Sequence, residues 1–211
     1  MLLADNGLGG RIQASPGAAG WCPLCKEPLT PKCGEIVSWH WSHRAGSDCD
    51  PWAEGESAWH LAWKAEFDES QVENPIGRHR ADIIAGGTVI ELQHSSLKPE
   101  EVREREDFYL REVGRIIWVI DMTTADISFT HAGDPDSRVH QFLWSRPRKW
   151  LLACTTRVYW DLGDGVMFRM GHLNADGTSL LGRRFRNSNG WGFMGTKDEF
   201  LSFFRGGDKA A

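Results

Sequence analysis

The spacing of apolar and polar residues predicts a helix over residues 56–69. This stretch, ESAWHLAWKAEFDE, contains neither Gly nor Pro. It spaces Glu56, His60 and Lys64 four residues apart, so these polar side chains share one helical face, and two Trp residues follow a neighbouring stripe. An amphipathic helix of this kind has a polar face that can carry functional side chains.

A strand, a helix and a second strand are predicted between residues 88 and 121. The stretch LKPEEVREREDFYLREVG has Pro99 suited to a first helical turn, acids early and Gly114 as a stop. The following RIIWVID is apolar on both faces, which is typical of a central and often parallel strand. With TVIELQ before the helix, this order predicts a right-handed βαβ crossover.

A β-hairpin is predicted just before the crossover helix. Its arms are RHRADII and TVIELQ, joined at residues 85–87, where the Gly-Gly pair can take the positive φ of a tight turn. The preceding QVENP is predicted to be a strand that Pro75 ends.

The rest of the chain is predicted to be rich in short strands. The expected elements are strands at 11–14, 127–131, 158–161 and 166–170 and a last helix at 197–204. We predict three parts: an N-terminal strand and zinc-finger-like module (1–52), a core (53–145) and a β-rich C-terminal extension (146–211).

Composition favours a globular protein without a uniformly basic surface. Apolar residues make up 41% of the 211 residues and the net charge is -5, so any contact with nucleic acid must be local. RPRK (146–149) and GRRFR (182–186), near Trp144, Trp150 and Trp191, could follow a backbone and stack on bases, or could be solvated loops. Without a signal or membrane segment in the sequence, we expect a cytoplasmic protein that contacts no membrane.

Cysteine and histidine residues between positions 22 and 49 predict a structural zinc site. CPLC supplies Cys22 and Cys25, and HWSH supplies His40 and His43, the ligand types of a tetrahedral Zn²⁺ site. Two residues between the histidines is fewer than usual, and Cys33 or Cys49 could replace either one. The alternative is a set of free thiols beside surface histidines.

Acidic residues on the predicted hairpin and helix point to a second metal site. Alternation along a strand puts Glu91 and Gln93 on one face, where Asp82 of the other arm can lie beside them, with Glu56 contributed by the helix. Unpaired carboxylates repel one another, and a divalent cation removes that penalty. A surface ion-pair network is the competing explanation. His60 and Lys64 on the first helix, and Arg105 and Tyr109 on the second, can face the same place.

Six motifs in order resemble the CoiA-like competence protein family. They read CPLC, HWSH, ESAWHLAWK, RAD, ELQHS and REDFY and span roughly residues 10–121, and the tail resembles the family only faintly. The resemblance implies an α/β fold with a restriction-endonuclease-like mixed β-sheet flanked by helices, a core of the PD-(D/E)XK type.

The resemblance also implies which residues act. Asp82, Glu91 and Glu56 would hold Mg²⁺ or Mn²⁺, and Gln93 would stand where a Lys is usual. Because an amide performs only part of that lysine's role, Lys64 or His60 would have to reach in, or activity would be weak. Arg105 and Tyr109 would steady a phosphate or the hydrogen bonds of the site.

The leading hypothesis is therefore a metal-dependent nuclease acting on DNA, in DNA uptake, recombination or phage-related processing, with other DNA-processing proteins as possible partners. A rival is a non-catalytic, DNA-binding recombination-mediator module with the same fold, which Gln93 favours. A third is a zinc-ribbon adaptor for protein partners.

Overall fold

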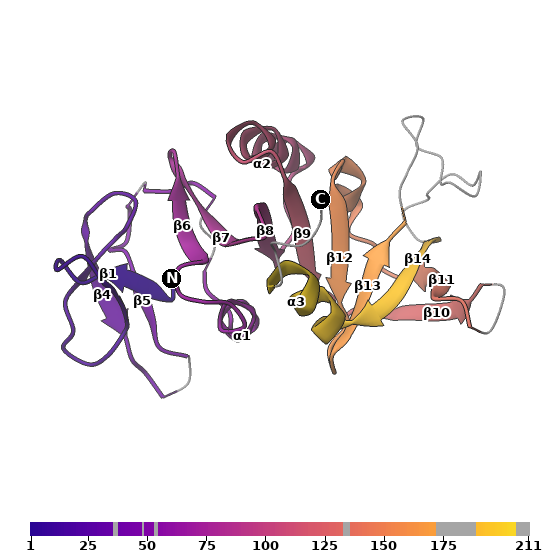
Figure 1. The fold of residues 1–211 in the computed structure, drawn as a ribbon, viewed down its shortest axis with the longest axis horizontal. Helices are drawn as coiled ribbons and strands as arrows, with labels where there is room; N and C mark the ends of the chain where they lie inside the picture. Colours follow the sequence, from indigo (N-terminus) through magenta and orange to yellow (C-terminus); the bar gives the residue numbers. More distant parts are fainter. Residues whose placement is uncertain (36–37, 48, 53–54, 133–135, 172–188, 206–211) are drawn as a thin grey trace. The chain divides into compact units, whose positions relative to one another are not determined.

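The computed structural model describes residues 1–35, 38–47, 49–52, 55–132, 136–171 and 189–205. The chain divides into two compact units, residues 1–85 and 86–211, which are described separately below (Figure 1). The boundaries predicted at 52/53 and 145/146 stay predictions. The basic cluster GRRFR lies outside the described residues.

The first unit contains a small sheet, one helix and a pair of strands. The sheet has the order β2-β1-β3-β4-β5. Its strands are β1 (Leu3–Asp5), β2 (Arg11–Gln13), β3 (Gly20–Trp21), β4 (Pro28–Lys32) and β5 (His40–Ser42). Trp41, Leu29, Ala4 and Cys22 form its small buried core. The sequence predicted β2 and a loop-rich segment, but not the other strands, which are too short for alternation to reveal.

The helix of the first unit is shorter than predicted. Helix α1 spans Ala58–Lys64, and the Ser57 side chain caps it by accepting a hydrogen bond from the His60 backbone N–H. Serine stabilises a helix more as a cap than inside it, so Glu56 lies outside the helix. After Lys64, Glu66 and Phe67 donate to carbonyls three residues back, and the chain leaves the helix in a tighter turn.

Two antiparallel strands complete the first unit. Strand β6 (Val72–Ile76) pairs with β7 (His79–Ala85), with Val72 opposite Ile83 and Ile76 opposite His79. The prediction that Pro75 ends β6 is wrong, because the strand continues to Ile76.

The second unit contains a mixed sheet, which confirms the predicted α/β class. Its strands lie in the order β10-β11-β14-β13-β12-β9-β8. They are β8 (Thr88–Gln93), β9 (Ile116–Asp121), β10 (Ile127–His131), β11 (Val139–Trp144), β12 (Arg157–Asp161), β13 (Val166–Met170) and β14 (Asn189–Thr196). Strands β8, β9 and β12 are parallel, and the other pairings are antiparallel.

The predicted βαβ crossover is confirmed. Helix α2 (Pro99–Glu112) joins β8 to the parallel strand β9, with Pro99 in its first turn and Gly114 at a positive φ of 88° just beyond its end. Every residue of β9 is buried, as expected for a strand that is apolar on both faces. Strand β12 lies directly beside β9, so the C-terminal extension shares a sheet with the core.

Helices α2 and α3 (Lys197–Arg205) cover opposite faces of this sheet. Trp118 of β9 donates to Glu106 of α2, whereas the ring of Tyr159 in β12 packs on Phe200 of α3. Tyr159 aligns with Val119, the neighbour of Trp118, and successive side chains on a strand point to opposite faces.

Buried tryptophans hold the second unit together. The ring of Trp160 lies 4.7 Å from that of Phe142 and 5.5 Å from that of Trp144, and Trp118 packs on Trp150. Trp144 and Trp150 are each 4% exposed. The idea that these two stack on nucleic-acid bases is therefore wrong, because both rings belong to the core.

Glu106 ties the crossover helix to the segment before β12. Its buried carboxylate accepts hydrogen bonds from Trp118 Nε1 at 2.9 Å, from Thr155 N and Oγ1 at 2.9 and 2.6 Å, and from Thr156 N and Oγ1 at 3.1 and 2.7 Å. This segment follows a short 3₁₀ helix, η1 (Lys149–Ala153), that packs on α2.

We expect Glu106→Gln to lower the free energy of unfolding by about 1–3 kcal/mol, because an amide NH₂ cannot accept the bonds made by one carboxylate oxygen. Urea denaturation would measure this change. Glu104→Gln, at an exposed position on the same helix, is the matched control and should change stability by less than about 0.5 kcal/mol. Equal effects of the two substitutions would contradict the role given to Glu106.

Within the part of the chain that the structure describes, no helix is long and apolar enough to span a bilayer.

Candidate functional site

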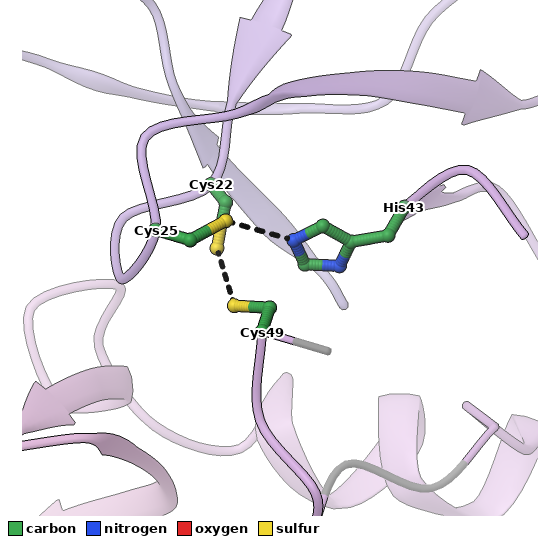
Figure 2. Close-up of side chains that lie close together, drawn as sticks. All are labelled: Cys22, Cys25, His43 and Cys49. Atoms are coloured by element: carbon green, nitrogen blue, oxygen red, sulfur yellow. Dashed lines mark hydrogen bonds between the residues drawn. The ribbon is translucent and has the colours of Figure 1, made fainter. Parts of the chain in front are cut away.

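Three cysteines and one histidine meet in the first unit. Figure 2 shows Cys22, Cys25, His43 and Cys49 directed at one another. The Sγ atoms of Cys22 and Cys49 lie 3.6 Å apart, and Cys25 Sγ lies 3.3 Å from His43 Nε2. All four ligand atoms lie within 4.8 Å of one another. A tetrahedral Zn²⁺ with bonds of about 2.3 Å to sulfur would separate two sulfurs by about 3.8 Å, so this set fits a structural metal ion.

A tight turn presents the two cysteines of CPLC. Cys22 follows β3, its N–H donates to the Glu27 carbonyl at 2.8 Å, and its own carbonyl accepts from Lys26 N at 3.0 Å. Lys26 has a left-handed φ of 62°, which turns the chain back after Cys25. This turn brings both thiols to the same side of the loop.

The predicted ligand set is corrected at one position, because Cys49 takes the place expected for His40. Trp41 of β5 is buried in the core, so His40 points to the opposite face, where its Nδ1 lies 2.9 Å from the Ser38 carbonyl oxygen. The side chain of His43, two residues beyond Trp41, points to the same side as Trp41. Cys33, the other substitute considered, packs beside the core but is not part of the cluster.

The protonation states of His43 and Cys49 bear on how the cluster would bind a metal ion. Burial lowers the pKa of His43, which favours the neutral imidazole that binds metals. Burial raises the pKa of the Cys49 thiol, and hydrogen bonds with Cys25 and Cys22 raise it further. Metal binding must therefore displace a thiol proton at Cys49.

Lys64 contacts three acidic residues of the first unit. Its Nζ lies 2.8 Å from Glu56 Oε1, 3.0 Å from Glu73 Oε1 and 3.0 Å from Asp82 Oδ1. Its side chain is 1% exposed. Burial disfavours the charged ammonium, but the three carboxylates outweigh this effect and raise the pKa of Lys64 well above its ordinary value.

Sequence reasoning missed Glu73. It lies on β6 opposite Asp82 of β7, is fully buried and has a left-handed φ of 53°. Its carboxylate accepts hydrogen bonds from the backbone N–H groups of Leu2 and Leu3. Burial would raise the pKa of Glu73, but Lys64 and these bonds lower it. The only sequence signal was an acid inside a predicted strand, the same signal that singled out Glu91.

Glu56 keeps one carboxylate oxygen without a hydrogen bond. Glu56 Oε1 contacts Lys64 and lies 3.3 Å from the Met1 amino group, whereas Glu56 Oε2 is buried and has no hydrogen-bond partner among the described residues. A buried carboxylate oxygen without a donor is costly. An added cation in this place would satisfy it. Among the described residues, however, the Cys₃His cluster is the one group of three or more possible ligands whose atoms lie close enough together to hold a metal ion.

His60 lies on the same helix but is oriented by its own cap. It is 5% exposed, and its Nδ1 lies 2.8 Å from the Ser57 hydroxyl.

The second unit holds the remaining predicted residues. Glu91 of β8 is 3% exposed and its Oε2 lies 3.3 Å from Arg105 Nη1 of α2, while Arg105 Nη2 contacts Glu101 at 2.5 Å. Gln93 Nε2 donates to the Ser95 carbonyl and hydroxyl oxygens. Tyr109, four residues after Arg105, is buried.

These contacts revise the reason for placing a carboxylate in an apolar strand. From the sequence we expected a metal ion to neutralise these carboxylates, but Arg105 already supplies a positive charge to Glu91, as Lys64 does to Asp82. Glu56, Lys64 and Asp82 are brought together in the first unit, and Glu91 and Arg105 in the second. The meeting of all these residues at one point stays a prediction.

Two family models match the chain. The N-terminal domain of competence protein CoiA matches residues 21–51, and the nuclease-like domain of CoiA matches residues 64–155. Together they cover more than half of the sequence. The chain belongs to the CoiA family. No curated protein and no solved structure matches it.

The family matches fall on the groups of side chains described above. The N-terminal match contains all four residues of the Cys₃His cluster. The nuclease-like match begins at Lys64 and contains Asp82, Glu91, Gln93, Arg105 and Tyr109. Glu56 and His60 lie between the two matches, and strands β12 to β14 lie beyond them.

Proposed function

We propose that this protein is a Mg²⁺- or Mn²⁺-dependent nuclease that hydrolyses phosphodiester bonds in DNA, in DNA uptake, recombination or phage-related DNA processing. The match to a nuclease-like domain supports the reaction class. The observation that carries the metal proposal is Glu56 Oε2, a buried carboxylate oxygen with no hydrogen-bond partner among the described residues, on a side chain whose Oε1 contacts Lys64.

Asp82, Glu91 and Glu56 are the proposed ligands of the catalytic ion. Such an ion supplies a bound water of lowered pKa and offsets the charge that develops on the phosphate. Asp82 has the exposure this role needs, because its side chain is 22% exposed while Glu56 and Glu91 are nearly covered.

The chain's own cations and hydrogen-bonding groups would position the reactants. Lys64 would hold Asp82 and Glu56 in place and offset negative charge, the role that Gln93 cannot fill. Arg105 would orient Glu91 through its contact at 3.3 Å. His60 would contribute from the same helix as Lys64, and Tyr109 would support Arg105 from one turn away.

We also propose that the Cys₃His cluster binds Zn²⁺, since three thiolates and one imidazole are a usual zinc set. Its role would be structural, because a site with four protein ligands keeps no position open for a water or a substrate.

A non-catalytic DNA-binding module is the second candidate. The Arg105–Glu91 contact favours it, because a carboxylate already paired with a guanidinium is a poorer metal ligand. Gln93 favours it as well, because an amide performs only part of the role of the usual lysine.

Cleavage of labelled single-stranded and duplex DNA tests the choice. With Mg²⁺ or Mn²⁺ we expect cutting, and Asp82→Asn or Glu91→Gln should reduce its rate by at least about 100-fold, on the scale of losing one strong transition-state interaction. Omitting the divalent ion should stop cutting, and this arm avoids chelators that would also remove zinc.

Asp68→Asn is the matched control, since Asp68 is exposed in the same unit and its loss should leave the rate unchanged. Cutting without a divalent ion, or full activity in both site variants, would overturn the nuclease proposal. DNA binding without cutting would select the second candidate.

A further inference from the structure

A cavity lies at the base of the β10–β11 hairpin in the second unit. Ile127 pairs with Trp144 at this end of the hairpin, and Ser145 Oγ donates to Asp126 Oδ2 at 2.7 Å just beyond it. The cavity has a volume of about 390 Å³, within the range of roughly 300–1,000 Å³ of small-molecule sites. Its lining residues are Thr124, Ala125, Asp126, Trp144, Arg146 and Arg148.

Two arginines line this cavity. Arg146 and Arg148 flank Pro147, whose ring fixes its own φ. The chain bends at Ser145 and Arg146 after strand β11, and both arginines line the cavity. The chain is fixed on both sides, because Trp144 and Trp150 are buried.

Arg148 has a donor that no group in the described chain satisfies. Its Nη1 is buried and makes no hydrogen bond to any described residue. Burial lowers the pKa of Arg148, and the nearby Asp121 only partly offsets this effect. Asp121 is itself engaged by His94 at 2.7 Å and by Thr123, and Asp126 is engaged by Ser145. Arg148, which lines the cavity, therefore carries a buried donor that no described group satisfies, and the acids near it are already hydrogen-bonded.

We infer that this cavity binds a phosphate group of a nucleic-acid strand through Arg148 and Arg146. A guanidinium presents a planar fork of N–H donors that matches phosphate oxygens, and two arginines lining one cavity suit a single tetrahedral anion. The inference rests on the proposed function, which makes a nucleic acid the substrate. It assigns a place on the second unit where the strand's backbone is held.

Binding of a fluorescein-labelled single-stranded oligodeoxynucleotide would test this site. Anisotropy titrations use the full-length chain in the Asp82→Asn background without added Mg²⁺ or Mn²⁺, so that the strand is not cut. We expect Arg148→Met to weaken binding roughly tenfold, equally for different sequences, because a phosphate contact carries no sequence information. The dependence of log affinity on log salt should become shallower by about 0.7, the value for one phosphate on a single strand.

Arg148→Lys and Arg115→Gln are the controls. Lysine keeps the charge without the fork, so Arg148→Lys should recover part of the affinity. Arg115 is exposed in the same unit, and Arg115→Gln removes the same charge away from the cavity, so it should change affinity by less than about twofold. Melting temperatures of all variants show whether each is folded.

Unchanged affinity in a folded Arg148→Met protein, or an equal loss in Arg115→Gln, would overturn the inference. So would competition by free inorganic phosphate at the oligonucleotide's own concentration, since that result would make the cavity a site for the free anion. Binding that depends on Arg148 without cutting by the Asp82-containing protein would retire the nuclease proposal and keep this site. Cutting that does not depend on Arg148 would overturn this site and keep the nuclease proposal.

Discussion

Cys49→Ser is expected to release the bound metal and unfold the N-terminal module. A structural zinc site contributes on the order of 10 kcal/mol to the folding of a small domain, about as much as the whole stability of a typical protein. The core around Trp41 and Cys22 is small and cannot replace that contribution. Cys22→Ser should have the same effect. Zinc-to-protein ratio by mass spectrometry and limited proteolysis of the first unit would measure the loss.

Two control variants distinguish the Cys₃His cluster from the ligand set predicted from the sequence. His40→Ala should keep the metal, because the His40 ring faces away from the cluster and lies beside the Ser38 carbonyl. Cys33→Ser should also keep it, because Cys33 packs on the same core without joining the cluster. Loss of metal in His40→Ala together with retention in Cys49→Ser would show that the cluster is wrongly assigned.

Lys64→Met should destabilise the protein by about 3–5 kcal/mol at neutral pH, as expected when one partner of a buried ion pair is removed. Lys64 is 1% exposed and contacts Glu56, Glu73 and Asp82. Methionine fills a similar volume but leaves these carboxylates to repel one another. Urea denaturation would measure the loss, and Lys32→Met, at an exposed position of the same unit, should cost less than about 0.5 kcal/mol.

The cost of Lys64→Met should shrink as the pH falls from about 7 to about 4. In the wild type the pKa of Glu73 is lowered from 4.5, so its contribution to stability is full above that unfolded value and stays nearly constant as the pH falls to about 4.5. In the variant the clustered carboxylates favour the protonated form, so acid relieves their repulsion. A pH-independent difference between the two proteins would contradict this account of Lys64.

The crossover was the most predictable part of the fold. Pro99 and Gly114 mark the ends of α2 through local backbone geometry, and the continuous apolar run of β9 requires cover on both faces. Strands β11 and β14 were not predicted. Strand β14 contains three glycines, which are unfavourable in strands, and it pairs with distant strands on both sides.

The sequence alone determined the elements whose cause is local: the proline start and glycine stop of α2, the βαβ order and the CPLC pair as metal ligands. It also singled out Lys64 and Asp82 by motif. Only the tertiary structure decided that Cys49 rather than His40 completes the cluster, and that Glu73 joins Lys64. Both outcomes depend on which face of a strand meets the core and on segments distant in sequence, and no local pattern carries that information.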